Sequence, residues 1–522
     1  MMNFSWRVAF YQIVLCIILN VATTSSRQPK NVLFLVSDDM RPALGCYKGA
    51  RPGFHCPPMH TPNLDSLAET SVLFEKAYVQ QSLCSPSRTS FLTSRRPDTT
   101  RILDLNSYFR TYGGNFTTIP QFFKEMGYAS IDVGKIFHPG PDASGRDDQP
   151  YSWTETPYHA KWNYHNEESW KALTAEELKE KPLQDAVEIE HAVNKLRELA
   201  KDFEENAQPF FLAIGAQKPH LPFVFPEEFL SYYPSDEIKV PSNPFIPIGM
   251  PDMAWSNFGE LRSYTDASGE AVGVPDLGMA NVTYPEYKIK ELRRAYYAAV
   301  SFVDFNMGKI LNELKDLNLE NDTIVVFLGD HGWQLGEHSE WCKLTNFEVA
   351  NHAPLMIRVP GLTDNGIRTS KLAEFVDIFP TLVEAAGFPS LDTCSLDSNN
   401  EILCTEGSSL LPLMKNPDYA PWKESVFWQY PRGGNQKPHI PKCMGYSIRT
   451  EFYHYNEWVQ IIAHNDGSYE PNWDESCDRA ELYDLDIDPK ENTNVFDFPD
   501  YEEVKLELMK KLRDGWRSEI CL

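Results

Sequence analysis

The chain has 522 residues, of which 42% are hydrophobic, and its formal net charge at pH 7 is −26. This length exceeds that of one small core and indicates one large domain with a smaller one. The excess of acidic residues excludes a broad nucleic-acid-binding surface, which needs Lys and Arg in excess. A local basic pocket could still bind a single anionic group.

The first 25 residues have the layout of a cleaved signal peptide. Arg7 precedes an apolar run at 8–19, which is shorter than the about 20 residues of a membrane-spanning helix. We therefore expect entry into the endoplasmic reticulum, lysosomal delivery or secretion, and no membrane attachment after cleavage. Three sequons agree with this route and are candidate N-glycan sites: Asn115, Asn281 and Asn321.

The cysteine count also agrees with export. Ten cysteines are encoded, and removal of Cys16 with the signal peptide leaves nine. If one thiol has a separate chemical fate, we expect the other eight to form disulfides. Cys394 and Cys404 are close enough in sequence to close a small loop, and Cys46 with Cys56 is a second candidate pair. The partners of the remaining thiols stay open: Cys342, Cys443, Cys477 and Cys521.

Strands and helices alternate along most of the chain. Apolar runs typical of strands buried on both faces lie at 31–37, 209–215, 323–329 and 355–359. Helical patterns lie between them at 63–70, 187–203 and 287–317. This alternation predicts an α/β fold with a large mixed, mostly parallel sheet flanked by helices. A segment rich in Pro, Gly and Ser at 235–284 is predicted to be a long surface loop.

The pattern changes near residue 418. Short strand-like segments occur at 425–429, 446–449, 452–455 and 458–462, and a helical pattern occurs at 501–516. They predict a smaller C-terminal α+β subdomain with a short antiparallel sheet. The predicted organisation is a signal peptide at 1–25, a catalytic domain at 26–418 and a C-terminal subdomain at 419–522.

Acidic residues follow two of the predicted strands. Asp38 and Asp39 end the first strand, and Asp330 with His331 ends a much later one. Because sites in open α/β sheets form at the carboxyl ends of strands, we expect these side chains to meet. Gathered carboxylates repel one another unless a cation lies between them, and their hard oxygens suit Ca²⁺ or Mg²⁺. The alternative is a pair of aspartates that only cap a strand at the surface.

A second candidate site is the segment Cys-Ser-Pro-Ser-Arg at 84–88, before a helix expected to begin at 90–93. A helix N-terminus offers free backbone N–H donors and the positive end of the helix dipole, which favour anions. Arg88 adds a planar fork of donors. From this pattern alone, Cys84 could equally be a buried thiol or a disulfide partner.

The segment 84–88, followed by Leu92 and Thr93, resembles the C-x-P-S-R and L-T-G motif of the sulfatase family, with Ser94 in place of the glycine. Further segments carry a closer likeness: 38–42, 95–101, 106–108, 134–140, 218–223, 330–333, 336–338 and 444–450. In these the chain resembles the iduronate 2-sulfatase branch, although the regions around 160–185 and 360–375 are shorter than in its vertebrate members.

This resemblance implies an alkaline-phosphatase-like fold and a defined centre. By it, Asp38, Asp39, Asp330 and His331 bind one cation, Ca²⁺ in the family. Cys84 is oxidised to Cα-formylglycine (3-oxoalanine) by the formylglycine-generating enzyme, and as a hydrate this residue also reaches the cation. One hydroxyl of the hydrate would attack sulfur, and deprotonation of the other would expel sulfate.

The resemblance also implies roles for cationic and aromatic side chains. Arg88, Lys135 and Lys343 match family positions that neutralise charge on the sulfuryl oxygens. Lys343 and Trp333 further match substrate-binding positions.

Two histidines match the positions of proton-transfer groups. His138 resembles the general base and His220 the acid that protonates the leaving alcohol, and the opposite assignment stays open. Arg95 and Arg96 are expected to support the site rather than to contact substrate.

The implied activity is hydrolysis of the 2-O-sulfate of non-reducing-end L-iduronate in heparan and dermatan sulfate by a monomer, with glycosaminoglycan ends as partners. The alternatives are a sulfatase for another sulfated sugar or polysaccharide, a phosphatase on the same fold, and a non-catalytic binder of sulfated glycans. A phosphatase would usually have Ser or Thr at the position of Cys84, and a non-catalytic relative would have lost the cysteine or a metal carboxylate.

Overall fold

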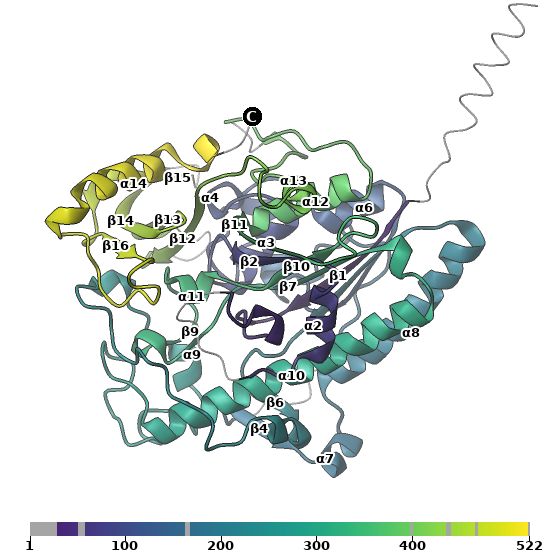
Figure 1. Cartoon of the computed structure of the whole chain (residues 1–522), viewed down its shortest axis with the longest axis horizontal. Coiled ribbons are helices and arrows are strands. Elements are labelled where there is room, and N and C mark those ends of the chain that lie inside the picture. Colours follow the sequence, from purple (N-terminus) through teal and green to yellow (C-terminus); the bar gives the residue numbers. More distant parts are fainter. Residues whose placement is uncertain are drawn as a thin grey trace, which may run out of the picture.

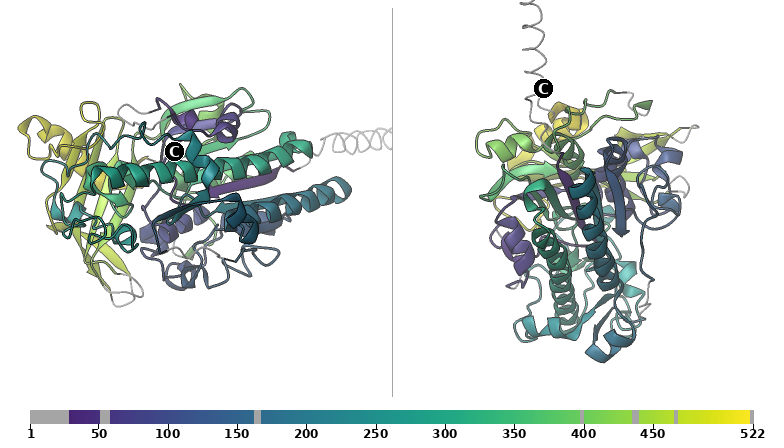
Figure 2. Two further views of the ribbon diagram at one scale, coloured as in Figure 1. Left: turned by 90° about the horizontal axis from the view of Figure 1, so that it is seen from below. Right: turned by 90° about the vertical axis from the view of Figure 1, so that its right-hand side faces the viewer.

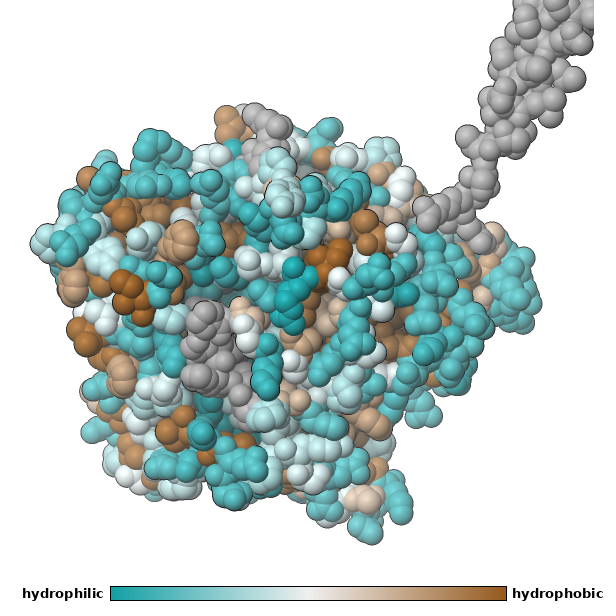
Figure 3. Space-filling model, viewed as in Figure 1, coloured by the Kyte–Doolittle hydropathy of each residue, from teal (hydrophilic) through white to brown (hydrophobic). Residues whose placement is uncertain are grey.

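The computed structural model describes residues 29–50, 58–161, 167–396, 400–434, 440–464 and 468–519. The predicted signal peptide and Cys56 lie outside the described residues. Among the described helices, none combines the length and the apolar character that a membrane crossing requires. On the face seen in Figure 3, hydrophilic residues predominate and apolar ones form scattered groups, as expected for a highly charged chain.

A seven-stranded sheet forms the centre of the molecule, in the order β11-β2-β10-β7-β1-β5-β3. β10 runs antiparallel to both of its neighbours, whereas the other adjacent pairs are parallel. The predicted mixed, mostly parallel sheet is therefore confirmed. The strands are β1 (Asn31–Ser37), β2 (Val72–Tyr78), β3 (Ala129–Gly134), β5 (Phe210–Ala216), β7 (Thr323–Gly329), β10 (Leu355–Arg358) and β11 (Ile367–Glu374).

Helices cover both faces of this sheet (Figures 1 and 2). Alternate residues of β1 join different cores: Leu33 and Leu35 belong to one, Val32 and Phe34 to the other. The first core is completed by α2 (Pro62–Ala68), α8 (Gln184–Asn206) and α10 (Glu286–Asp316). The second is completed by α3 (Cys84–Thr93), α6 (Ile119–Glu125), α12 (Ile378–Ala385) and α13 (Leu411–Lys415).

A second, antiparallel sheet lies at one side of the molecule together with α14 (Glu502–Asp514), in yellow in Figure 1. Its strands are β12 (Val426–Arg432), β13 (Cys443–Arg449), β14 (Tyr453–Ala463), β15 (Tyr469–Ser476) and β16 (Glu481–Asp484). The shorter elements are β4 (Trp170–Leu173), β6 (Phe223–Pro226), β8 (Gln334–Leu335), β9 (Trp341–Cys342), α4 (Pro97–Thr100), α5 (Phe109–Tyr112), α7 (Ala175–Glu180), α9 (Gly259–Arg262) and α11 (Glu348–Asn351).

Several strands were missing from the sequence prediction or divided wrongly. β2 carries Glu75 and Lys76, and β11 lies at the sheet edge with alternating polar residues, so neither gives a continuous apolar run. β14 is one strand of 11 residues where two were predicted. α3 begins at Cys84, before the predicted start, because Pro86 is compatible with the first turn of a helix.

Some of the predictions for the cysteines are confirmed and others are wrong, and the sequons lie on the surface. The predicted Cys394–Cys404 disulfide is confirmed, and a second bridge joins Cys443 to Cys477. Cys342 is a buried, unpaired thiol in β9, so the expectation that eight cysteines pair is wrong. The three sequon asparagines, Asn115, Asn281 and Asn321, are exposed, so glycosylation there would displace no core side chain.

A buried ion cluster connects the end of β11 to the start of the second sheet. Glu374 accepts hydrogen bonds of 2.8 and 2.9 Å from the Arg96 guanidinium, 2.8 Å from Lys423 Nζ and 3.0 Å from the Phe427 backbone N–H. Burial raises the pKa of Glu374, but Arg96 and Lys423 outweigh it and lower this pKa to about 2. Loss of the Glu374 charge would leave two buried cations poorly compensated.

We predict that Glu374→Gln lowers the free energy of unfolding at pH 7 by about 3–5 kcal/mol, the usual effect of breaking a buried ion pair. Because the folded-state pKa is depressed, the stabilisation is complete above about pH 4.5 and is lost as the pH falls toward 2. The difference between wild type and variant should therefore shrink over that range in urea unfolding curves.

The matched control is Glu313→Gln on α10, which breaks an ion pair with Arg197, whose side chain is 55% exposed. This change should destabilise the protein far less than Glu374→Gln does. Equal losses for the two variants would contradict a stabilising role for the buried cluster.

Candidate active site

The parallel pairing of β1 with β7 brings the acidic strand ends together. Ser37 pairs with Gly329 at the carboxyl end of both strands, and the Asp330 N–H donates to Ser37 O at 3.0 Å. Asp38 and Asp330 therefore leave the sheet side by side, as the sequence predicted. Asp39 adopts a left-handed backbone with φ of 58°, and its N–H donates to Asp330 Oδ1 at 2.9 Å.

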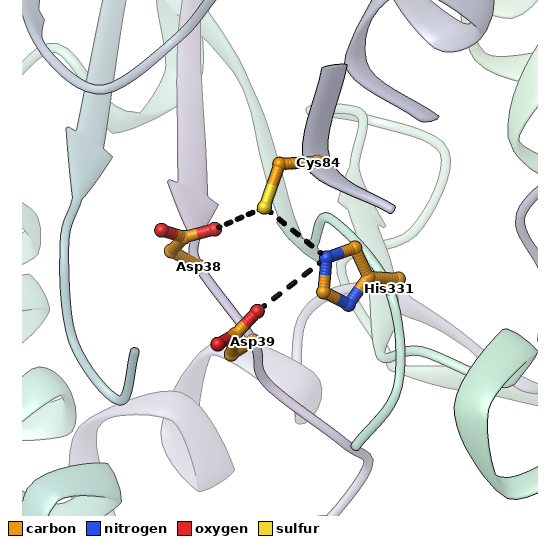
Figure 4. Close-up of side chains that lie close together, drawn as sticks. All are labelled: Asp38, Asp39, Cys84 and His331. Atoms are coloured by element: carbon orange, nitrogen blue, oxygen red, sulfur yellow. Dashed lines mark hydrogen bonds and ion pairs between the residues drawn. The ribbon is translucent and has the colours of Figure 1, made fainter. Parts of the chain in front are cut away.

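The N-terminus of α3 places Cys84 directly against these residues (Figure 4). Its Sγ lies 3.5 Å from Asp38 Oδ1, 3.4 Å from His331 Nε2 and 3.4 Å from Lys343 Nζ. The side chain is buried, and burial followed by the Asp38 charge raises the pKa of the thiol well above its ordinary value. The encoded side chain is therefore a neutral thiol at the centre of the charged cluster.

Four side chains here form a group that could hold a metal ion. One ligand atom from each of Asp38, Asp39, Cys84 and His331 lies within 4.8 Å of all the others. Asp39 Oδ2 is buried without a hydrogen-bond partner, and burial raises the pKa of Asp39 well above its ordinary value despite the nearby Lys343. An orphaned carboxylate oxygen among oxygen and nitrogen donors fits a divalent cation.

Asp330, the fourth predicted ligand, lies beside this group and has hydrogen-bond partners of its own. Its Oδ1 accepts from the Asp39 N–H, its Oδ2 accepts from Arg88 Nε at 2.9 Å, and His331 Nε2 is 3.6 Å from Oδ2. Asp330 therefore lies next to the four-residue group, and its carboxylate already has partners.

Three buried cations neutralise the carboxylates. The Arg88 guanidinium bridges Asp38 and Asp330, at 3.3 and 2.9 Å. The Nζ of Lys135 contacts Asp38 and that of Lys343 contacts Asp39. Burial lowers the pKa of each lysine, but Asp38 and Asp39 outweigh it, and both pKa values are raised. Both ammonium groups therefore stay charged in this pocket.

The two candidate histidines occupy different positions. His220 Nε2 lies 3.8 Å from Asp39 Oδ2, so this ring borders the carboxylate cluster, and its Nδ1 is 2.6 Å from Leu221 O. His138 Nδ1 lies 2.9 Å from Asp142 Oδ2, and the ring is 20% exposed. Among the described residues, the ionic contact of His138 is thus with Asp142 rather than with a member of the cluster.

The remaining predicted residues lie behind the cluster or away from it. Trp333 is buried, with its Nε1 unpartnered and its ring 5.2 Å from Lys343 Nζ. It therefore packs under Lys343 rather than at an exposed rim. Arg95 contacts Cys394 Sγ, and Arg96 belongs to the ion cluster of Glu374.

Glu260 was not among the predicted site residues. This residue lies in α9, within the segment predicted to be surface loop, and its Oε1 is 3.4 Å from His220 Nε2. Together with Asp39 and His220 it forms a second group of possible ligands. A single glutamate in a stretch rich in Pro, Gly and Ser gives no pattern from which this position could be inferred.

Comparison with known proteins agrees with this geometry. Residues 30–388 match the model of the Sulfatase family, and residues 336–517 match that of the N-sulphoglucosamine sulphohydrolase C-terminal domain. The chain is 37% identical to iduronate 2-sulfatase of Mus musculus over 94% of this chain and 96% of the relative. It is also 37% identical to iduronate 2-sulfatase of Homo sapiens, over 92% and 94%.

Solved structures share the fold at lower identity. A phosphonate monoester hydrolase from Silicibacter pomeroyi has a TM-score of 0.69 at 19% identity, covering 94% of this chain and 96% of its own. A structure in complex with its substrate D-glucosamine-2-N,6-O-disulfate has a TM-score of 0.65 at 21% identity, covering 94% and 98%. The family model and the 37% identical relatives establish that the chain belongs to the sulfatase family and is a sulfuric ester hydrolase.

Proposed function

We propose that this sulfatase removes the 2-O-sulfate of non-reducing-end L-iduronate in heparan and dermatan sulfate, with a formylglycine at position 84 and one Ca²⁺. The observation that carries the proposal is the place of Cys84, whose sulfur lies within 3.5 Å of Asp38, His331 and Lys343. The residue that the family motif marks for oxidation thus stands among the candidate cation ligands. Similarity to iduronate 2-sulfatases over 94% of the chain supports the substrate.

Asp38, Asp39, Asp330 and His331 would hold the cation, and the oxidised residue 84 would complete the set. When bound, the cation supplies Lewis acidity toward the sulfate ester. A hydrated formylglycine would supply two hydroxyl groups, one as the nucleophile and one from which a base removes a proton as sulfate leaves. A serine at this position would lack the second hydroxyl.

The positively charged side chains of the pocket would also favour binding of an anion. Arg88, Lys135 and Lys343 now neutralise buried carboxylates. A divalent cation bound to the same carboxylates would neutralise their negative charge in place of the lysines. The lysine ammonium groups could then interact with the sulfuryl oxygens of the substrate. The backbone N–H groups at the start of α3 add fixed positive potential beside residue 84.

We assign His220 to protonation of the leaving sugar oxygen. Its Nδ1 is fixed by Leu221 O, while its Nε2 faces Asp39 and Glu260 at the edge of the cluster. His138 is the candidate base, because its Nδ1 lies 2.9 Å from Asp142 Oδ2 and its Nε2 would be the atom that accepts a proton.

The proposed route is through the endoplasmic reticulum to the lysosome or the extracellular space, as a monomer. The predicted signal peptide and the exposed sequons at Asn115, Asn281 and Asn321 support this route. The formylglycine-generating enzyme would act during biosynthesis.

The substrate assignment predicts sulfate release from oligosaccharides that end in 2-O-sulfoiduronate, with little or none from ends that carry glucosamine 6-sulfate. Ion chromatography of released sulfate measures both. Activity on glucosamine 6-sulfate ends alone would show a sulfatase for a different sugar and would reject the iduronate assignment.

The metal assignment predicts that Asp39→Asn lowers kcat/KM by about 10³-fold or more, since a Lewis acid contributes several kcal/mol to the transition state. Treatment of the wild type with EGTA should abolish activity, and added Ca²⁺ should restore it. Isothermal titration should detect Ca²⁺ binding by the wild type and by Asp364→Asn, a change at an exposed aspartate. Normal Ca²⁺ binding by Asp39→Asn would contradict the assignment.

The two histidines are distinguished by leaving groups of different acidity. His220→Ala should slow the sugar sulfate by about 10²–10⁴-fold and an aryl sulfate with an acidic phenol much less, because the phenolate leaves without protonation. His138→Ala should slow both, since both substrates share the release of sulfate from the enzyme. The reverse pattern in steady-state kinetics would exchange the two roles. His464→Ala, at an exposed histidine, serves as the control.

A further inference from the structure

A third cluster of possible metal ligands lies beside the edge strand β3. Asp132 belongs to β3, and Asp147 and His159 belong to the segment that follows it. One ligand atom of each lies within 4.8 Å of the other two. None of the three belongs to the group around Cys84.

The carboxylate of Asp132 has no hydrogen-bond partner in its own surroundings. The residue is 2% exposed, and neither of its carboxylate oxygens makes a hydrogen bond among the described residues. Asp147 Oδ1 is likewise buried and unpartnered. Burial, with added repulsion from Asp147 and Glu188, raises the pKa of Asp132 well above its ordinary value. The Arg88 charge offsets this shift only in part. A buried carboxylate without a hydrogen-bond partner is a candidate ligand for a cation.

The positions of these side chains are fixed by the backbone around them. The Trp153 Nε1–H donates to Asp147 O at 2.6 Å, and Arg110 holds the adjacent Asp148 at 2.6 and 2.8 Å. The Tyr158 N–H donates to Asp132 O at 3.1 Å. The backbone therefore already holds Asp147 and His159 near Asp132.

Glu188 on α8 adds to the negative charge around the cluster. It is 2% exposed; its Oε1 accepts from the Ala160 N–H at 3.0 Å and from Gln184 Nε2 at 2.9 Å, while Oε2 is unpartnered. His159 offers the one imidazole, with its Nε2 2.9 Å from Asp147 Oδ2, and its side chain is 33% exposed. The exposed ring gives an ion a way into the buried carboxylates.

We propose that Asp132, Asp147 and His159 bind a divalent transition-metal ion, Zn²⁺ by ligand type, at a site separate from that of Asp38 and Asp39. Two carboxylates and an imidazole form a mixed oxygen and nitrogen set that suits Zn²⁺, whereas Ca²⁺ takes six to eight oxygen ligands. Ligands about 2.1 Å from one ion lie at most about 4.2 Å apart, so small side-chain rotations would close the cluster. Water would complete the coordination.

The ion would fasten the 147–159 segment to β3. The residues that directly follow β3 lead to Lys135 and His138, so the site would stabilise the start of a catalytic loop without touching substrate. The inference holds whichever sulfate ester the enzyme hydrolyses.

Titration of the purified glycosylated protein with Zn²⁺, in excess Ca²⁺, tests the proposal. The wild type should bind one tight equivalent. Asp132→Asn and His159→Gln should weaken binding by at least about 100-fold, since even second-shell changes cost 10–100-fold. Asp39→Asn and the surface variant His464→Gln should bind as the wild type does, which separates this site from the active site and from adventitious histidine binding.

The visible absorption spectrum of bound Co²⁺ gives a second test, which needs no substitution in the cluster. The wild type with Co²⁺ and excess Ca²⁺ should show the intense visible bands of a four-coordinate site, and so should Asp39→Asn. Absence of a tight Zn²⁺ equivalent, loss of it in Asp39→Asn, or equal binding by all variants would overturn the proposal and leave a hydrogen-bonded Asp–His pair.

Discussion

The active site depends on the repulsion between three carboxylates that the fold buries together. Asp38, Asp39 and Asp330 are fully buried at the ends of two neighbouring strands. Without compensation, the burial of each charge would cost several kcal/mol of stability. The folded protein therefore needs positive charges beside these carboxylates. Arg88 meets this need by bridging two of them, and it lies one turn into α3. The ion pairs that hold α3 against the sheet therefore also hold Cys84 at the centre of the cluster.

The fold alone does not select the reaction, since phosphonate monoester hydrolases have the same architecture. The reaction that the enzyme catalyses depends on the residue at position 84 and on the charges around it. The proposed oxidised residue 84, among hard ligands and with Lys343 beside it and Lys135 on Asp38, would form a pocket for the charged oxygens of a sulfate ester. The buried ring of Trp333 lies 5.2 Å from Lys343 Nζ, within the range of a cation–π contact.

The parts of the structure that follow from local pattern could be predicted from the sequence. Buried strands such as β1 and β7 are continuous apolar runs, and parallel pairing then forces Asp38 to meet Asp330. Long-range packing leaves no such pattern. Glu260 reaches His220 from an irregular segment, and Asp132 lies in a short edge strand, so neither position was found. The predicted domain boundaries and catalytic roles stay predictions.

Mass spectrometry of the peptide that carries residue 84, from active enzyme expressed in eukaryotic cells, tests the central claim most directly. The account predicts formylglycine at this position, detected as the aldehyde or its hydrate, in an amount that follows specific activity across preparations. Fully active enzyme in which residue 84 is unmodified cysteine at full occupancy would contradict it.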